Sequence, residues 1–268
     1  QGYSSAASDV YKRQVELETM LRGICEKKTF LDLLENFILY DHSGGRTTKI
    51  LARNHQYLGV NEAVSAYENR KLKDGRLGVF WHTQGSGKSY SMVFLAQKIR
   101  RKFAGSPTIV VLTDRDELNR QISDTFENCG LLGKTKASQF IASSGTDLVK
   151  KLQGNPSFVF TLIQKFNLLK EPPIYPDHDI LILSDEAHRS QYGIFADNMM
   201  HLLPTASRIG FTGTPLLADD HITERIFGGY LSVYDFKRAV EDGATVPLYY
   251  ENLSLIHISE PTRQEAIS

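Results

Sequence analysis

The chain has few cysteines, no excess of either charge and no long apolar run, and each shortage excludes a class of protein. Its 268 residues include only Cys25 and Cys129, too few for a disulfide framework or a cysteine-rich zinc site. Basic and acidic residues number 31 each, so no overall positive field attracts nucleic acid. No apolar stretch approaches the roughly 20 residues of a membrane helix, and no secretory signal stands at the start. We therefore expect a cytoplasmic protein without a membrane partner, in which any nucleic-acid contact comes from a local groove.

A glycine-rich segment at residues 81–89 has the composition of a phosphate-binding loop. The apolar run at 79–81 is fit for a buried strand, and apolar residues recur at helical spacing over 90–103. The segment therefore joins a strand to a helix N-terminus, where unpaired N–H groups and the positive end of the helix dipole attract phosphate. A purely structural turn is the alternative, but the flanking strand and helix favour a nucleotide site.

The residue types within this loop suit the same chemistry. Gly85 and Gly87 allow the backbone to approach phosphates without a clash from Cβ. Lys88 can reach the β and γ phosphates of a nucleotide, and the Ser89 hydroxyl can bind Mg²⁺. In one departure, His82 stands where the usual motif begins with glycine. The predicted nucleotide contacts in the loop are Gln84, Gly85, Ser86, Gly87, Lys88 and Ser89.

An acidic motif follows the aliphatic run at 180–183, which is typical of a central parallel strand buried on both faces. The strand ends at Ser184 and places Asp185 and Glu186 at the carboxyl edge of the sheet, where open α/β sheets bind ligands. Asp185 is predicted to hold Mg²⁺ through water, and Glu186 to orient or activate the attacking water. A helix N-cap is the alternative interpretation of the two carboxylates. The predicted catalytic residues are thus Lys88, Asp185 and Glu186, and the predicted Mg²⁺ ligands are Ser89 and Asp185.

The order of elements along the chain favours an α/β fold with a mainly parallel sheet and helices on both faces. Apolar spacing predicts two helices within residues 15–40, a loop at 41–46 and further helix over 48–71. Another helix opens at Asp114 and Arg115. The expected strands cover residues 79–81, 108–113, 158–162, 180–184 and 208–212.

Several smaller motifs accompany the loop and the acidic motif in a fixed order. They lie at residues 111–118, 161–166, 211–215 and 241–247. In this order the motifs resemble those of superfamily 2 helicases and translocases, in particular the motor (R) subunit of type I restriction enzymes. The resemblance covers nearly all of residues 15–253 and depends on the combination of motifs. It implies a RecA-like P-loop NTPase domain, the first of two in such a motor, preceded by a short helical segment.

Both ends of the chain look foreign to this fold. Residues 10–14 and 254–263 resemble translated sequencing-adapter read-through at the ends of assembled gene fragments, and genuine disordered tails are the alternative. The predicted divisions are a non-native or disordered tail at 1–14, a helical linker at 15–46, the first RecA-like ATPase domain at 47–253 and a second tail at 254–268.

The resemblance also implies roles for particular side chains. Gln56 looks like the glutamine that reads adenine, and a surface helical glutamine is the alternative. The ends of the expected strands at 108–113 and 158–162 resemble the family's contacts with the backbone of the tracked DNA strand. A solvated helix cap is the alternative for the first of them. The end of the expected strand at 208–212, together with His188, resembles the motif that couples the γ-phosphate to the DNA groove. A simple turn before Pro215 is the alternative for the strand end. The implied DNA contacts are Thr113, Arg115, Thr161, Gln164 and Lys165, and the implied coupling residues are His188, Thr212, Gly213 and Thr214.

The function implied by the resemblance is that of the ATP-binding motor domain of a type I restriction endonuclease R subunit. Such a motor uses ATP and Mg²⁺ to translocate double-stranded DNA, and its parent complex, with methyltransferase and specificity subunits, cleaves the DNA. The family completes its ATP site with arginines from a second RecA-like domain and cleaves with a separate Asp and Glu-x-Lys nuclease. We recognise neither in this sequence, so we expect the 268-residue chain to lack nuclease and efficient ATPase activity. The alternatives are the ATPase domain of another superfamily 2 DNA or RNA helicase, and a non-catalytic nucleotide-binding or structural fragment.

Overall fold

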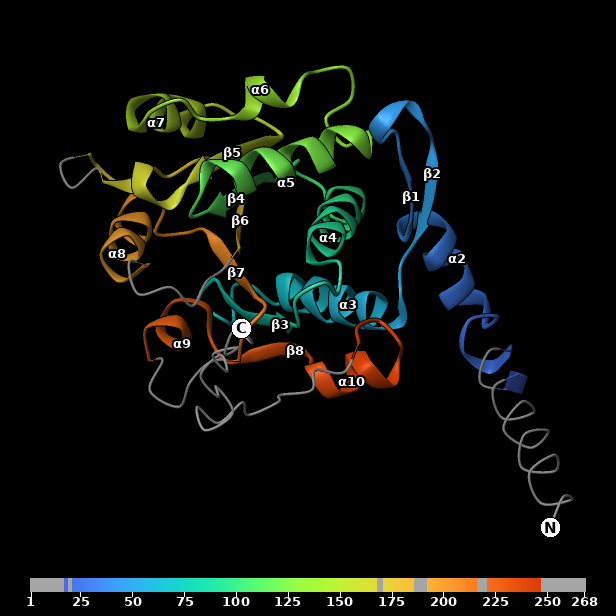
Figure 1. The fold of residues 1–268 in the computed structure, drawn as a ribbon. Helices are drawn as coiled ribbons and strands as arrows, with labels where there is room; N and C mark the ends of the chain where they lie inside the picture. The colour runs from blue at the N-terminus through green and yellow to red at the C-terminus, as the bar shows by residue number, and fades with distance from the viewer. Residues whose placement is uncertain (1–16, 19–20, 168–170, 186–191, 216–220, 247–268) are drawn as a thin grey trace, which may run out of the picture.

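A six-stranded parallel sheet forms the centre of the molecule (Figure 1). The computed structural model describes residues 17–18, 21–167, 171–185, 192–215 and 221–246. The strands follow the order β5-β4-β6-β7-β3-β8, and all neighbouring pairs are parallel. They are β3 (Arg76–His82), β4 (Thr108–Thr113), β5 (Phe158–Leu162), β6 (Ile180–Asp185), β7 (Ser207–Thr212) and β8 (Tyr230–Tyr234). The predicted α/β fold with a mainly parallel sheet is confirmed.

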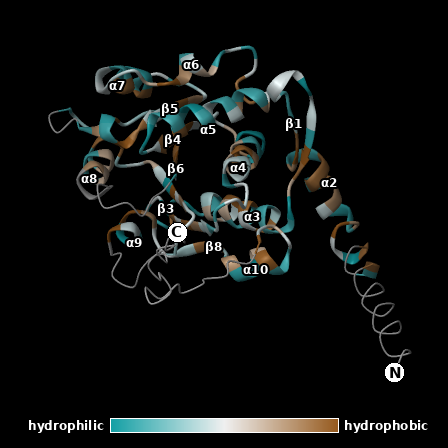
Figure 2. Cartoon of the chain, in the orientation of Figure 1, coloured by the Kyte–Doolittle hydropathy of each residue, from teal (hydrophilic) through white to brown (hydrophobic). Residues whose placement is uncertain are grey.

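Helices cover both faces of the sheet, because successive side chains of a strand point to opposite faces. In β4, Ile109 and Val111 pack into one apolar cluster, whereas Val110 and Leu112 pack into another. The first cluster includes residues of α3 (Asn54–Glu68), α4 (Lys88–Lys102) and α5 (Asp116–Asn128). The second includes residues of α7 (Gly145–Gln153), α8 (Tyr192–Leu202) and α9 (His221–Phe227). Figure 2 shows hydrophilic residues along α5 and hydrophobic residues in the strands behind it.

The structure confirms all five predicted strands and adds a sixth strand to the parallel sheet. The strands predicted at 108–113 and 158–162 have the predicted bounds, and the other three extend by one to four residues. Strand β8, which lies at the edge of the sheet, was not predicted. Three of its five side chains are only partly buried and one is exposed, so it lacks the continuous aliphatic run of a central strand.

The N-terminal part of the chain departs from the predicted helices. The helix predicted to reach residue 40 ends earlier, because α2 (Lys27–Asn36) is followed by β1 (Ile38–Asp41). The start of the helix predicted at 48–71 is instead β2 (Thr48–Leu51), which pairs antiparallel with β1. Leu39 is buried and Tyr40 exposed, which is the alternation of a strand. The helix predictions are wrong over these two segments, because short apolar runs do not distinguish a helix from a strand.

The hairpin β1–β2 and α2 are attached to α4, the helix that follows the glycine-rich loop. The Tyr90 hydroxyl donates to the Asp41 carboxylate at 2.6 Å, and the Lys98 ammonium lies 2.6 Å from Asp32 Oδ2. Polar contacts therefore join this N-terminal segment to the sheet domain across the predicted boundary at residue 46. The division into linker and ATPase domain stays a prediction.

Four short elements complete the described chain: η1 (Ser43–Gly45), α6 (Ala137–Phe140), η2 (Ile163–Phe166) and α10 (Phe236–Glu241). The two predicted tails, 1–14 and 254–268, lie outside the described residues. Within the part of the chain that the structure describes, no helix combines the length and apolar character that a membrane span requires.

Candidate nucleotide site

Three motifs far apart in the sequence meet at the carboxyl edge of the sheet. The glycine-rich loop follows β3, the acidic motif follows β6, and the turn at 212–214 follows β7, which lies between them. Register places Trp81 beside Thr212, and Asp185 beside Phe211. Because all three strands are parallel, their following loops emerge on the same side, as open α/β sheets require for ligand binding.

The glycine-rich loop has the backbone of a phosphate cradle. Gly85 and Gly87 adopt φ values of 79° and 81°, in the left-handed region that favours glycine. A Cβ on Gly87 would lie 2.9 Å from the Gln56 side-chain nitrogen, so a side chain at this position would displace the Gln56 amide. α4 begins at Lys88, and its first N–H groups have no carbonyl partner within the helix. Gln84 is exposed on the loop and Ser89 is half-buried in the first turn, positions that fit a bound triphosphate.

The Lys88 side chain connects the loop with the turn after β7. Its ammonium group lies 3.2 Å from the His82 carbonyl oxygen and 3.5 Å from that of Thr83. A Cβ on Gly213 would lie 3.2 Å from the same ammonium nitrogen. The predicted coupling turn is therefore in the immediate vicinity of the predicted catalytic lysine.

The turn itself is held by its own side chain. The buried Thr212 hydroxyl accepts from the Thr214 N–H at 3.1 Å and lies 3.0 Å from the Thr214 carbonyl oxygen. This geometry is that of a strand-ending turn, and its place against Lys88 is also what a coupling role requires. The coupling role of Thr212, Gly213 and Thr214 stays a prediction.

The position of the His82 side chain shows how the loop can begin with a residue other than glycine. The imidazole is fully buried beneath the loop, 3.9 Å from the Phe80 ring, and its Nε2 lies 3.0 Å from the Ser232 hydroxyl. Burial lowers the pKa of His82 to about 3, so the ring is neutral at physiological pH. The side chain thus belongs to the core rather than to the phosphate cradle.

The first turn of α3 lies directly behind the loop. Gln56 is 4% exposed, so it is not the surface glutamine of the alternative interpretation. Its side-chain oxygen accepts from the Arg53 N–H at 2.9 Å, and its nitrogen donates to the Gly87 carbonyl at 3.0 Å. Both ends of the amide are therefore engaged with the protein, and adenine reading stays a prediction. The sequence analysis missed His55, whose Nε2 lies 3.0 Å from the Ser86 carbonyl oxygen; only its place beside Gln56 could have suggested it.

The acidic motif is described only in part. Asp185 ends β6 and is 9% exposed, at the edge where Mg²⁺ binding is predicted. Glu186 and His188, the predicted base and a predicted coupling residue, lie outside the described residues. Among the residues that the structure does describe, no group of three or more His, Cys, Asp or Glu could hold a metal ion alone. Magnesium binding with few protein ligands is usual where phosphates and water supply the rest.

The five predicted DNA contacts lie in the last residues of β4 and β5 or just after them, and these neighbouring strands form the other half of the same edge. Thr113 and Thr161 are 1% and 0% exposed, and their hydroxyls lie 3.4 Å and 3.5 Å from the carbonyl oxygens of Arg115 and Leu162. Both hydroxyls thus complete strand ends inside the protein. As they stand, they present little surface to a DNA strand.

The remaining three predicted DNA contacts are more accessible. The Arg115 side chain is 57% exposed, with its Nε 3.7 Å from the Asp114 carboxylate. Gln164 is exposed and donates to the Asp114 carbonyl at 2.9 Å, which joins the loops that follow β4 and β5. Lys165 is half-buried and donates to the Ala142 carbonyl. DNA contact by this surface stays a prediction, and Arg115 and Gln164 are the side chains best placed for it.

A parallel sheet with a glycine-rich loop at a helix N-terminus, an aspartate at the end of a central strand and a threonine turn between them defines a P-loop NTPase with the RecA-like fold of superfamily 2 helicases. The model of the SWI2/SNF2 ATPase family matches residues 55–264, and the chain belongs to this family.

Curated relatives narrow this assignment. The type I restriction enzyme HindI endonuclease subunit of Haemophilus influenzae is 40% identical, over 91% of this chain and 25% of that protein. The putative type I restriction enzyme MjaIXP endonuclease subunit of Methanocaldococcus jannaschii is 36% identical, over 88% of this chain and 23% of that protein. The predicted relationship to type I R subunits is confirmed, and the chain spans about a quarter of the length of these relatives.

Solved structures support the fold. The UvsW helicase from bacteriophage T4 superposes with a TM-score of 0.53 at 18% identity, over 76% of this chain and 67% of that one. A nuclease-deletion mutant of the Type ISP restriction-modification enzyme LlaGI, in complex with a DNA substrate mimic, gives 0.53 at 18% identity, over 72% of this chain and 20% of that one. At this identity the likeness concerns the fold alone.

Proposed function

We propose that the chain is the ATP-binding motor module of a type I restriction endonuclease R subunit, which couples ATP hydrolysis to translocation along double-stranded DNA. The observation that carries this proposal is the convergence of the phosphate cradle, Lys88 and the Gly213 turn at one edge of the sheet. Relatives at 40% and 36% identity over about nine-tenths of the chain favour an R subunit over another superfamily 2 helicase.

In this proposal the loop binds phosphate through backbone and side-chain groups together. The N–H groups of Gly85 to Lys88 surround the phosphates, and the Lys88 ammonium exchanges its contacts with the carbonyls of its own loop for phosphate oxygens. Ser89 and Asp185 would hold Mg²⁺. The metal, when bound, offsets the negative charge on the transferred phosphoryl group. Glu186 orients or activates the attacking water.

The same edge of the sheet then connects hydrolysis with DNA. Gly213 lies against Lys88, so a change in the lysine's contacts reaches the turn at 212–214 and strand β7. Arg115 and Gln164 meet the phosphate backbone of the DNA, since guanidinium and amide groups bind phosphate without reading bases. Sequence recognition and cleavage belong to other parts of the parent complex, with its methyltransferase and specificity subunits.

A nucleotide-binding titration tests the core of this proposal. We expect Lys88→Ala to weaken binding of a fluorescent Mg-ATP analogue by roughly 10²-fold or more, by analogy with other lost contacts to reacting anionic groups. Lys102→Ala is the matched control, because Lys102 lies in the last turn of the same helix and pairs with Glu68 at 3.0 Å, away from the loop. If Lys88→Ala binds as tightly as the unchanged chain, the proposed nucleotide site is wrong.

A further inference from the structure

Two consecutive side chains hold the outer side of the glycine-rich loop. His55 Nε2 lies 3.0 Å from the Ser86 carbonyl oxygen, and the Gln56 amide donates to the next carbonyl, that of Gly87, at 3.0 Å. The Gly87 oxygen also accepts from the N–H of Ser91 within α4, at 3.1 Å. Among the described residues, His55 is the side chain that donates a hydrogen bond to the Ser86 carbonyl oxygen. The two side chains come from one turn of α3, so a rigid helix holds both carbonyls.

The orientation of these carbonyls determines where the loop's N–H groups point. A peptide unit is planar and trans, so its C=O and N–H point in opposite directions. Holding the Ser86 carbonyl toward α3 turns the N–H of Gly87 to the opposite side of the loop. Gly87 adopts φ 81° and has no side chain to restrict its rotation, so an outside contact is needed to fix this peptide.

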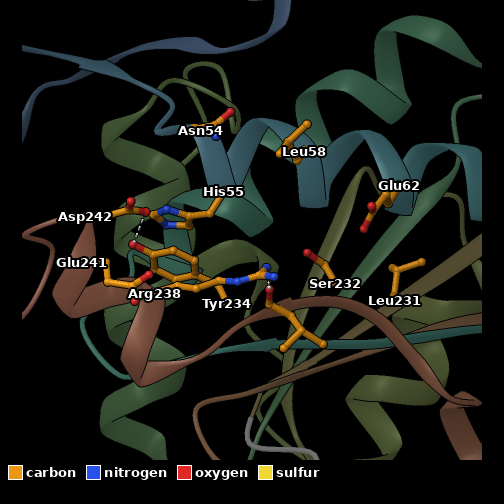
Figure 3. Close-up of a pocket in the computed structure, with 11 residues that line it drawn as sticks. Asn54, His55, Leu58, Glu62, Leu231, Ser232, Tyr234, Arg238, Glu241 and Asp242 are labelled. Atoms are coloured by element: carbon orange, nitrogen blue, oxygen red, sulfur yellow. Dashed lines mark hydrogen bonds between the residues drawn. The ribbon is translucent and has the colours of Figure 1, made fainter. Parts of the chain in front are cut away.

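His55 is itself held by residues from the end of the described chain. Its ring stacks on Tyr234 with centroids 3.8 Å apart and planes 12° from parallel (Figure 3). The Tyr234 hydroxyl donates to the Asp242 carboxylate at 2.9 Å, and Asp242 directly follows α10. A continuous line of contacts thus runs from the end of α10 through Tyr234 and His55 to the loop.

The protonation states agree with this geometry. A carbonyl oxygen only accepts, so His55 Nε2 carries the proton that is shared with Ser86. Burial lowers the pKa of His55, which keeps the ring neutral at physiological pH. Burial raises the pKa of Tyr234 to about 12, so its hydroxyl keeps its proton and can donate to Asp242.

The His55 side chain lies beside open space. A cavity of about 410 Å³ borders His55, Tyr234 and Asp242, between α3, β8 and α10 (Figure 3). The His55 ring also lies 5.4 Å from the buried His82 ring, centroid to centroid. A change of ring at this position therefore alters the polar contact with Ser86, the stack on Tyr234 and the contact with His82.

We propose that His55 is a positioning residue for phosphate binding: it fixes the Ser86–Gly87 peptide so that the Gly87 N–H faces the phosphates, and Tyr234 and Asp242 fix the imidazole. This inference rests on the proposed nucleotide site and names the residue that shapes it. Through Tyr234 and Asp242, the shape of the loop depends on the position of α10.

Three variants of His55 isolate the hydrogen-bond donor. His55→Phe keeps an aromatic ring against Tyr234 and loses the donor. His55→Gln retains an N–H donor at a similar reach, and His55→Met has a similar length and shape without one. We expect His55→Phe and His55→Met to raise the Kd of the fluorescent Mg-ATP analogue roughly tenfold, the effect of one lost hydrogen bond to a buried group. His55→Gln should stay within about threefold of the unchanged chain.

The competitor and the titration endpoint separate positioning from general damage. Inorganic tripolyphosphate, used to displace the analogue, should lose affinity by the same factor in His55→Phe, because the contact concerns phosphates and not the base. Irreversible unfolding would lower the number of binding sites per chain and leave the Kd of the folded fraction unchanged. Reversible unfolding would raise the apparent Kd by the inverse of the folded fraction, which circular dichroism of each variant measures.

The outcomes decide between the inference and the proposed function. An unchanged Kd in both His55→Phe and His55→Met overturns the role of His55 while the nucleotide site stands. Equal losses in His55→Gln and His55→Met also overturn it, because a donor would then make no difference. Absence of binding by the unchanged chain contradicts the proposed function instead. If His55→Phe does not fold, the comparison of Gln with Met decides.

Discussion

The two halves of the sheet's carboxyl edge use their motif residues differently. After β3 and β7, the loop and turn lie against each other, and buried donors on α3 hold the loop's carbonyls. After β4 and β5, Thr113 and Thr161 are buried in strand ends, whereas Arg115 and Gln164 are exposed. In the first half, backbone groups of the glycine-rich loop form the predicted phosphate site. In the second half, exposed side chains lie beside strand ends whose hydroxyl groups are buried.

This difference indicates which substitutions should weaken ligand binding at each half of the edge. Backbone N–H groups bind phosphate only if the whole loop keeps its shape, so a substitution behind the loop can weaken binding as much as one within it. Exposed side chains that meet a phosphate backbone act more independently, and each contributes a modest share. We therefore expect large, cooperative effects at the nucleotide half and small, separable ones at the predicted DNA half.

Turnover should show the largest effect. We expect Lys88→Ala to slow ATP hydrolysis roughly 10²- to 10³-fold, because the lysine ammonium would meet the phosphates on which negative charge develops. Lys102→Ala is the control, since Lys102 lies in the last turn of the same helix. A coupled ATPase assay with and without double-stranded DNA measures both variants. Equal turnover in Lys88→Ala and in the unchanged chain would contradict the expectation.

A substitution at Gly87 tests whether the cradle depends on its backbone. Gly87→Ala places a Cβ 2.9 Å from the Gln56 nitrogen, at a φ of 81° that L-residues rarely adopt. We expect the nucleotide Kd to rise roughly tenfold or more, since left-handed strain alone costs about 1–2 kcal/mol. Gly105→Ala is the control, because Gly105 has a φ of 98° and open space around it. Similar Kd values for the two variants would show that the contact with Gln56 does not shape the loop.

The free energy of unfolding should depend on pH because a buried histidine, His82, lies beneath the glycine-rich loop. The pKa of His82 falls to about 3 in the fold, from an ordinary value of 6.5. Between these values the unfolded chain binds a proton that the folded chain excludes, so stability rises with pH across this window. We expect acidification from pH 6 to pH 4 to cost the unchanged chain up to about 1.4 kcal/mol per pH unit more than His82→Phe.

Thermal and urea unfolding at each pH measure this difference. His201→Phe is the control, because His201 is exposed on α8. If His82→Phe and the unchanged chain lose stability in parallel, His82 is not the buried base that the geometry indicates.

The smallest effect concerns the predicted DNA half. Arg115→Ala should weaken double-stranded DNA binding by roughly threefold and reduce the salt dependence by about one phosphate contact, because one exposed charge is lost. Thr113→Val should leave DNA binding unchanged, since its hydroxyl lies inside the protein. Fluorescence anisotropy with a labelled duplex at several salt concentrations measures both. A loss in Thr113→Val that equals the loss in Arg115→Ala would show that the buried strand end also contacts DNA.

The central strands and the glycine-rich loop between β3 and α4 could be predicted from the sequence because their signals are local. A run such as 180–183 is apolar at every position, and its short length and β-branched residues favour a strand buried on both faces. The edge strand β8 escaped prediction because its mixed side chains carry no such pattern. The hairpin β1–β2 was mistaken for helix, because its apolar residues fit either period until pairing selects one.

By itself, the sequence determined the chemical groups of the proposed nucleotide site: two glycines, a lysine and a serine at a helix start, and carboxylates at the end of a buried strand. Local spacing and residue type are enough for this, since they depend on neighbours within a few residues. Only the tertiary structure decided that His55 and Gln56 hold the loop from behind, that His82 lies in the core, and that Thr113 and Thr161 are closed off from solvent. The physical reason is that burial and hydrogen-bond partners arise from contacts between distant segments, such as the 31 residues that separate His55 from Ser86.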